Sequence, residues 1–142
     1  MSVKCLGIHY VLDLKGCYRI AINSEEKVIE ILKHAALMAD TKIFSINSHK
    51  FSPQGVSGLI GIEESHLSMH TWPELGEVTA DFYTCGDRIK SLKAVKYIIR
   101  ECGACRWKMR VIFRGEYDWD SNRDEVLYGH IDESGKTIVR RG

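Results

Sequence analysis

VSGLIGIEESHLSMHTWPELGEVTADFYTCG, residues 56–86, is the stretch whose pattern of apolar and polar side chains decides the fold. Most large apolar side chains fall on even positions up to residue 62, and they do so again from residue 77 to 85. Between these runs Leu67 and Met69 are apolar, whereas His66, Ser68 and His70 share the opposite face. A period of two is typical of half-buried strands and cannot change phase within a regular strand. We therefore expect a bulge, a strand end or an ordinary turn between residues 63 and 66.

Further strands and two helices are predicted on both sides of this stretch. Apolar residues at helical spacing predict a helix over about 24–39, with Asn23 as its N-cap and Glu26 at the third position. A second helix is predicted over about 92–102. The predicted outer strands cover, in order, residues 4–14, 44–52, 109–113, 126–131 and 136–140.

This order of elements predicts an α+β fold. We expect a two-layer α/β sandwich, with a mostly antiparallel sheet and two helices on one face. The other face would carry the polar positions of the central strands, which are His66, Ser68, His70, Asp81 and Cys85. Such a face gathers reactive side chains on a surface that a partner subunit would close.

Length, composition and charge narrow the class of protein. The chain has 142 residues, of which 44% are hydrophobic and 27% charged, as is typical of a single globular domain. Twenty Lys and Arg balance nineteen Asp and Glu, so charge gives no argument for binding nucleic acid. Charged residues interrupt every apolar run well below the roughly 18 residues of a membrane span. We expect a cytoplasmic protein without a membrane segment.

Several common motifs are weak or missing. Cys102 and Cys105 form a C-x-x-C after a helix, without a second pair at zinc-finger spacing, so we interpret them as structural cysteines. His66 and His70 would face one metal ion only on a helix, and the Glu of H-E-x-x-H is absent. Glycine-rich phosphate loops and a nucleophile elbow for a hydrolase triad are also absent from the sequence. We therefore predict no metal site.

The segment from Glu64 to Glu74 (ESHLSMHTWPE) and the segment from Asp81 to Gly86 (DFYTCG) are far more specific. Together they resemble the prokaryotic-type S-adenosylmethionine decarboxylases, which are pyruvoyl enzymes of spermidine synthesis. The resemblance continues through Phe51–Gly58 and, more loosely, through His9 and the first helix, so it covers about residues 4–118. Residues 119–142 are then a possible C-terminal extension.

The resemblance implies that this chain makes its own pyruvoyl cofactor instead of binding pyridoxal phosphate. The Ser65 hydroxyl would attack the carbonyl of Glu64, and the proenzyme would split into a beta chain, 1–64, and an alpha chain, 65–142, headed by the pyruvoyl group. By the same match, His70 is the base for this processing and Ser57 a helper that hydrogen-bonds the intermediate. Imidazole suits this role because it titrates near neutral pH.

For decarboxylation, the family match implies that the substrate amine forms a Schiff base with the pyruvoyl group derived from Ser65. Cys85 would then be the proton donor to the α-carbon, a role open to a thiol. Phe51 and Trp72 are candidates to hold the adenine and the sulfonium, and Glu74 to hold the ribose, although each could equally be a packing residue.

The family also implies a homodimer of cleaved protomers with sites at the subunit interface. Two alternatives remain open at this point. The first is a pyruvoyl-dependent arginine or ornithine decarboxylase, because the motif specifies the cofactor more tightly than the substrate. The second is a non-catalytic regulatory paralogue, which would be expected to have lost Ser65, His70 or Cys85.

Overall fold

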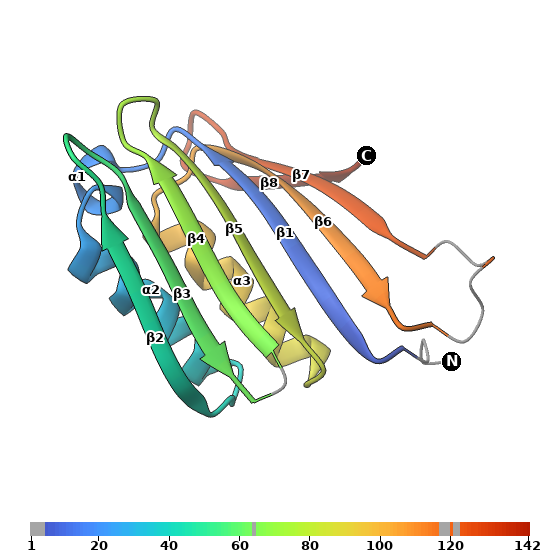
Figure 1. Cartoon of the computed structure of the whole chain (residues 1–142). Helices are drawn as coiled ribbons and strands as arrows, with labels where there is room; N and C mark the ends of the chain where they lie inside the picture. The colour runs from blue at the N-terminus through green and yellow to red at the C-terminus, as the bar shows by residue number, and fades with distance from the viewer. Residues whose placement is uncertain (1–4, 64, 117–119, 121–122) are drawn as a thin grey trace.

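The computed structural model describes residues 5–63, 65–116, 120 and 123–142 (Figure 1). In chain order, its elements are β1 (Gly7–Lys15), α1 (Arg19–Ile22), α2 (Glu25–Met38), β2 (Ile43–Lys50), β3 (Val56–Ile62), β4 (Ser65–Trp72), β5 (Glu77–Thr84), α3 (Arg88–Glu101), β6 (Arg106–Arg114), β7 (Glu125–Ile131) and β8 (Thr137–Arg141).

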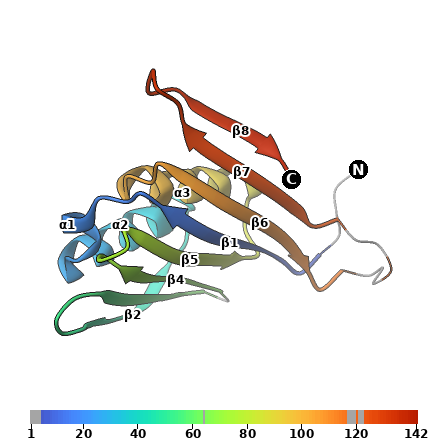
Figure 2. The same cartoon turned by 90° about the horizontal axis from the view of Figure 1, so that it is seen from above.

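The strands form one sheet in the order β2-β3-β4-β5-β1-β6-β7-β8. Each neighbouring pair is antiparallel, and the first strand of the chain lies in the middle of the sheet. Helices α2 and α3 lie side by side against one face, and the other face is left open (Figures 1 and 2). The predicted two-layer α+β sandwich is confirmed.

The phase change in the central stretch is a strand end. β3 ends at Ile62, β4 begins at Ser65, and these two residues are paired across the hairpin. Beyond the turn the apolar side chains of β4 again face the helices, with Leu67 and Met69 fully buried. The predicted C-terminal hairpin is also present, as β7 and β8 at the edge of the sheet.

Two details of the helices differ from the prediction. The cap of α2 is Ser24, whose Oγ accepts a hydrogen bond from the backbone nitrogen of Lys27 at 3.1 Å. Asn23 instead accepts from the backbone nitrogen of Gly55 at 2.9 Å, which ties the start of α2 to the β2–β3 turn. A third helix, α1, was not predicted, because four residues are too few to show a helical period.

The core lies between the sheet and the two long helices. The side chains that α2 buries against the sheet are Val28, Ile31, Leu32, Ala35 and Ala36. Gly58 lets α2 approach β3 closely, since a Cβ there would lie 3.0 Å from Leu32 Cδ1 and 3.2 Å from Val28 Cγ1. In α3, the buried Ser91 hydroxyl pairs with the Tyr10 hydroxyl of β1 at 2.8 Å. None of the described helices is long and apolar enough to cross a membrane.

Candidate active site

Ser65 is the first residue of β4, directly after the turn that joins it to β3. Its Oγ is buried and has no hydrogen-bond partner among the described residues. A buried hydroxyl normally finds a partner, so this one is unusual and is available for chemistry. Glu64, on the other side of the expected cleavage point, lies outside the described residues.

Cys85 lies at the same end of the sheet as Ser65. Because His66 pairs with Tyr83, Ser65 and Thr84 are at the same level, and Cys85 follows directly after Thr84. The Cys85 side chain is exposed, as expected from its place on the polar face. The Oγ1 of Thr84 accepts from the backbone nitrogen of Gly86 at 3.0 Å, which helps to end β5 at this position.

Ser57 and His70 form a pair at the other end of the same hairpin. They are opposite each other in β3 and β4, and Ser57 Oγ lies 2.9 Å from His70 Nδ1. Ser65 and His70 are five positions apart in one continuous strand, so about 16 Å of strand separates them. Ser65 also shares the helix-facing side with Leu67, whereas His70 is on the open face. The structure thus brings Ser57 and His70 together but keeps both away from Ser65.

The three candidate substrate residues lie at the His70 end of the sheet. Trp72 ends β4, Glu74 is in the following turn, and Phe51 is in the β2–β3 turn. The two turns are joined, because Gln54 Nε2 donates to Glu74 Oε2 at 2.8 Å. Phe51 and Trp72 are 46% and 43% exposed, so both offer aromatic surface to a ligand rather than filling the core.

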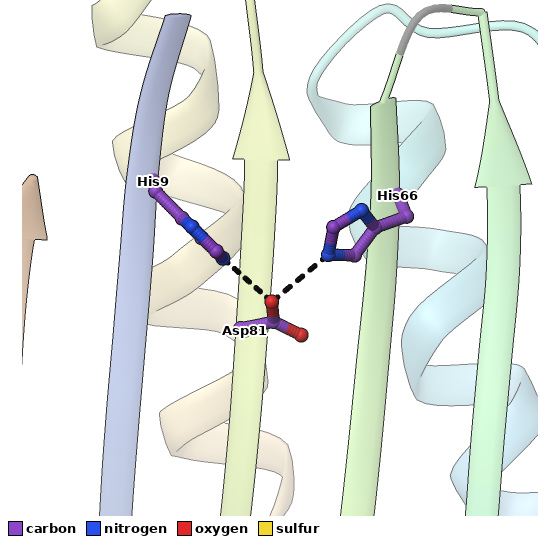
Figure 3. Close-up of side chains that lie close together, drawn as sticks. All are labelled: His9, His66 and Asp81. Carbon is purple, nitrogen blue, oxygen red and sulfur yellow. Dashed lines mark hydrogen bonds and ion pairs between the residues drawn. The ribbon is translucent and has the colours of Figure 1, made fainter. Parts of the chain in front are cut away.

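A cluster that the sequence did not identify lies in the centre of the open face. Asp81 Oδ2 accepts from His9 Nε2 at 2.6 Å and from His66 Nε2 at 2.9 Å (Figure 3). Ser68 also donates to Asp81 Oδ1. Burial disfavours the charged carboxylate, but the hydrogen bonds from Ser68, His9 and His66 outweigh it and hold the pKa of Asp81 below its ordinary value. Asp81 is therefore an anion with three donors.

This cluster has the residue types of a metal site, since one ligand atom from each of His9, His66 and Asp81 lies within 4.8 Å of the others. The hydrogen bonding favours a different reading. Arg114 Nη1 lies 3.4 Å from His9 Nδ1, and because a guanidinium can only donate, Nδ1 is the acceptor and Nε2 carries the proton. The His9 nitrogen that faces Asp81 is then a donor and not a free ligand. His66 and His70, four positions apart in a strand, are about 13 Å apart and cannot share a metal ion.

A groove of about 570 Å³ runs along the open face over β2, β3, β4 and β5. It is lined by the Ser57–His70 pair at one end and by His66 and Asp81 farther along. Away from this groove, Cys102 is fully buried and Cys105 is exposed with its Sγ 3.3 Å from the carbonyl oxygen of Gly16.

The polar residues were predicted well as a face and poorly as a network. Alternation placed His66, Ser68, His70 and Asp81 on one side of the sheet, and the structure confirms this. The contact between His9 and Asp81 was missed, because the sequence does not show that β1 lies beside β5. The sequence pointed to His9 only through its polar position in a predicted strand and its place in the looser part of the family resemblance.

Comparison with known proteins gives consistent results. Residues 8–115 match the family model described as S-adenosylmethionine decarboxylase, and this match ends before β7. The S-adenosylmethionine decarboxylase proenzyme of Carboxydothermus hydrogenoformans is 45% identical over 102 residues, which are 72% of this chain and 80% of the relative. The proenzyme of Caldicellulosiruptor saccharolyticus is 40% identical over 116 residues, 82% of this chain and 94% of the relative. The crystal structure of the adenosylmethionine decarboxylase from Aquifex aeolicus is similar with a TM-score of 0.76 and 37% identity, covering 84% of this chain and 99% of the other.

Proposed function

We propose that this chain, which belongs to the S-adenosylmethionine decarboxylase family, cuts itself before Ser65 and uses the pyruvoyl group so formed. The chain is an enzyme of this family, and its reaction releases the carboxyl group of S-adenosylmethionine as carbon dioxide. The product is the aminopropyl donor of spermidine synthesis. Decarboxylation of arginine or ornithine and a non-catalytic role are not favoured, because the relatives described above are named S-adenosylmethionine decarboxylase proenzymes.

The observation that carries the self-cleavage proposal is the buried Ser65 hydroxyl, which finds no hydrogen-bond partner in the described part of the chain and is placed directly after the β3–β4 turn. Its oxygen would add to the Glu64 carbonyl, and the peptide bond would be exchanged for an ester. Loss of the Ser65 α-proton then expels the Glu64 carboxylate, and addition of water with release of ammonia leaves the pyruvoyl group on the nitrogen of His66. No external cofactor is needed for these steps.

The pyruvoyl group supplies a carbonyl that can take up the electrons of the broken carbon–carbon bond. In this proposal Cys85 returns a proton to the substrate carbon, supported by its exposed position at the same end of the sheet as Ser65. Phe51, Trp72 and Glu74 would hold the substrate through aromatic faces and a carboxylate. The aromatic faces suit the adenine and the cationic sulfonium, and the Glu74 carboxylate would accept hydrogen bonds from the ribose hydroxyls.

The separation of Ser65 from the Ser57–His70 pair supports a homodimer with composite sites. Because about 16 Å of strand lies between Ser65 and His70, the pair cannot reach Ser65 of its own chain. A two-fold axis that crosses the middle of β4, with two open faces in contact, would place His70 of one copy over the Ser65 end of β4 in the other, where the Ser65 hydroxyl would have to turn from the helix-facing side to meet it. The candidate substrate residues, which lie at the His70 end, would come with it.

Intact-mass analysis of the purified protein tests the cleavage. We expect two chains, 1–64 and 65–142, the second with a blocked N-terminus, and a Ser65→Ala variant that stays uncleaved. An ordinary N-terminal serine, or an uncleaved Ser65→Ala protein that still decarboxylates, would contradict the proposal. Release of carbon dioxide should occur with S-adenosylmethionine and not with arginine or ornithine.

Co-expression tests the composite site. A Ser65→Ala chain supplies an intact Ser57–His70 pair, and a His70→Ala chain supplies an intact Ser65. If the pair acts across the dimer, the His70→Ala chain is cleaved when both are expressed together and stays uncleaved when it is alone. Cleavage that is equally absent in both cases would rule out the arrangement. The positive control partner is a Lys33→Ala chain, which is changed only at an exposed position of α2 and keeps the Ser57–His70 pair. It should support cleavage of the His70→Ala chain as the Ser65→Ala chain does.

A further inference from the structure

Asp81 of β5 links His66, the residue that follows Ser65 in β4, to His9 in β1. His66 is bonded directly to Ser65, and its ring is held by Asp81 from the neighbouring strand β5 (Figure 3). The side chain of Asp81 is only 22% exposed, although it is charged. Its two oxygens take three donors from two strands, and this satisfies a half-buried carboxylate well.

The donor from β1 is fixed in turn. Arg114 approaches His9 Nδ1 from β6, and the Arg114 guanidinium also lies over the Tyr83 ring, 4.9 Å from its centroid. The His9 ring is in contact with the same tyrosine, with centroids 5.3 Å apart. His9 therefore has one orientation and one tautomer, and its Nε2–H points at Asp81. This leaves Asp81 little freedom to rotate away from His66.

The same reasoning shows which ring nitrogen of His66 carries a proton. An ionised carboxylate can only accept, so the His66 nitrogen that faces it, Nε2, carries a proton. In the neutral ring Nδ1 is then an acceptor. Without Asp81 the ring would lose the hydrogen bond that holds its rotamer and its tautomer, and the ring is joined to the backbone nitrogen of residue 66 through Cβ and Cα alone.

We propose that Asp81 is a positioning residue of this enzyme: it holds the His66 ring in one rotamer as the Nε2–H tautomer, with His9 and Arg114 as the support behind it. This rests on the proposed function, in which the backbone nitrogen of His66 carries the pyruvoyl group made from Ser65. A fixed His66 side chain fixes the direction of that group, and misplacement of reacting atoms by about 1 Å can cost about 100-fold in rate.

Two substitutions at Asp81 separate hydrogen-bond geometry from general disturbance. Asp81→Ala removes the acceptor for both rings. Asp81→Asn keeps the shape and offers its amide oxygen to both Nε2–H groups, while its amide nitrogen can donate to Ser68. The matched control is Asp13→Asn, which makes the same chemical change on the same face of the sheet in β1.

The first measurement is the tautomer of His66 by long-range ¹H–¹⁵N correlation on ¹⁵N-histidine-labelled protein. It is made in the Ser65→Ala background, so it does not depend on cleavage or activity. We expect Nε2–H alone with Asp81 and with Asp81→Asn, and a mixture of both tautomers with Asp81→Ala. Nε2–H alone in the Ala variant would overturn the proposal.

The second measurement is steady-state kinetics of the cleaved enzyme. We expect Asp81→Ala to lower kcat about 10-fold or more with KM changed less than about 3-fold, and Asp81→Asn to recover most of kcat. An Asn variant as slow as the Ala variant, or a wild-type kcat in the Ala variant, would refute a positioning role. If the Ala variant does not fold, the Asn variant still decides, because a tautomer mixture in it would contradict the proposal. Failure of the self-cleavage scheme is detected separately, by an uncleaved wild-type chain.

Discussion

Replacing Thr71 by valine removes one hydroxyl that serves two backbone groups. Thr71 Oγ1 accepts from the nitrogen of Val56 at 2.9 Å and donates to the carbonyl oxygen of Ile22 at 2.7 Å, and the residue is 6% exposed. Valine keeps the shape of the side chain but leaves both groups without this partner. Each buried polar group left unpaired costs about 1–3 kcal/mol. The added methyl group returns about 0.8 kcal/mol. We therefore expect the free energy of unfolding to fall by about 1–5 kcal/mol.

Urea denaturation in the Ser65→Ala background measures this change on an uncleaved chain, with all variants at the same protein concentration. At about 3 °C per kcal/mol for a chain of this length, Tm should fall by about 3–15 °C. Thr79→Val is the control, because Thr79 is on the open face opposite His70, and its effect should stay below about 1 kcal/mol. If Thr71→Val costs no more than Thr79→Val, the argument from the shared hydroxyl is refuted.

Three further predictions concern charge, catalysis and thiol reactivity. The pKa of Asp81 in the folded protein is below its ordinary value, so its stabilising contribution is present above about pH 4 and is lost as the pH falls through the folded pKa. From about pH 5 to pH 2, the free energy of unfolding of the wild type should therefore fall more steeply than that of Asp81→Asn. Acid denaturation measures both curves, and parallel curves would contradict this prediction. Cys85→Ala should still cleave itself but lose about 100-fold or more in kcat, and near-normal turnover in a carbon dioxide release assay would remove Cys85 as the proton donor. Burial raises the pKa of Cys17 to about 12 and that of Cys102 well above its ordinary value. A thiol reagent at pH 8 should therefore label the exposed Cys85 and Cys105 in the native protein and leave Cys17 and Cys102 unmodified. Peptide mass mapping measures this, and rapid labelling of all four cysteines would contradict it.

The fold class was predictable because the alternation of apolar and polar residues within each strand shows which side of that strand is buried. Val78, Ala80 and Phe82 alternate with polar residues, and this alone indicates a sheet with one covered face. The two long helices were predictable from apolar spacing for the same reason. The order of the strands was not predictable, because pairing of β1 with β5 and β6 depends on long-range packing that no local pattern encodes.

In the candidate site, likewise, individual residues could be predicted from the sequence, but contacts between distant segments could not. Ser65, His70 and Cys85 were named as candidate catalytic residues through a family resemblance, and the alternation placed His70 correctly on the open face. Contacts between distant segments were out of reach: His9 and Asp81 are 72 positions apart, and their hydrogen bond exists only because β1 lies beside β5. Ser57 and His70 could be named separately, but their contact required the register of the β3–β4 hairpin.

The register of that hairpin also bears on how Ser65 could meet His70. Within one chain, β4 would have to leave the sheet between these residues, which would expose Leu67 and Met69, both fully buried. Exposing two such side chains costs about 3–6 kcal/mol before any lost backbone hydrogen bond is counted. That is a large part of the stability of a typical domain. In the proposed dimer, a second copy would bring its own His70 over the Ser65 end of β4 without this cost, because the pair lies on the open face, the sheets of both chains stay intact, and only Ser65 at the strand end would have to turn. The energetics of the hairpin therefore favour processing between chains over processing within one chain.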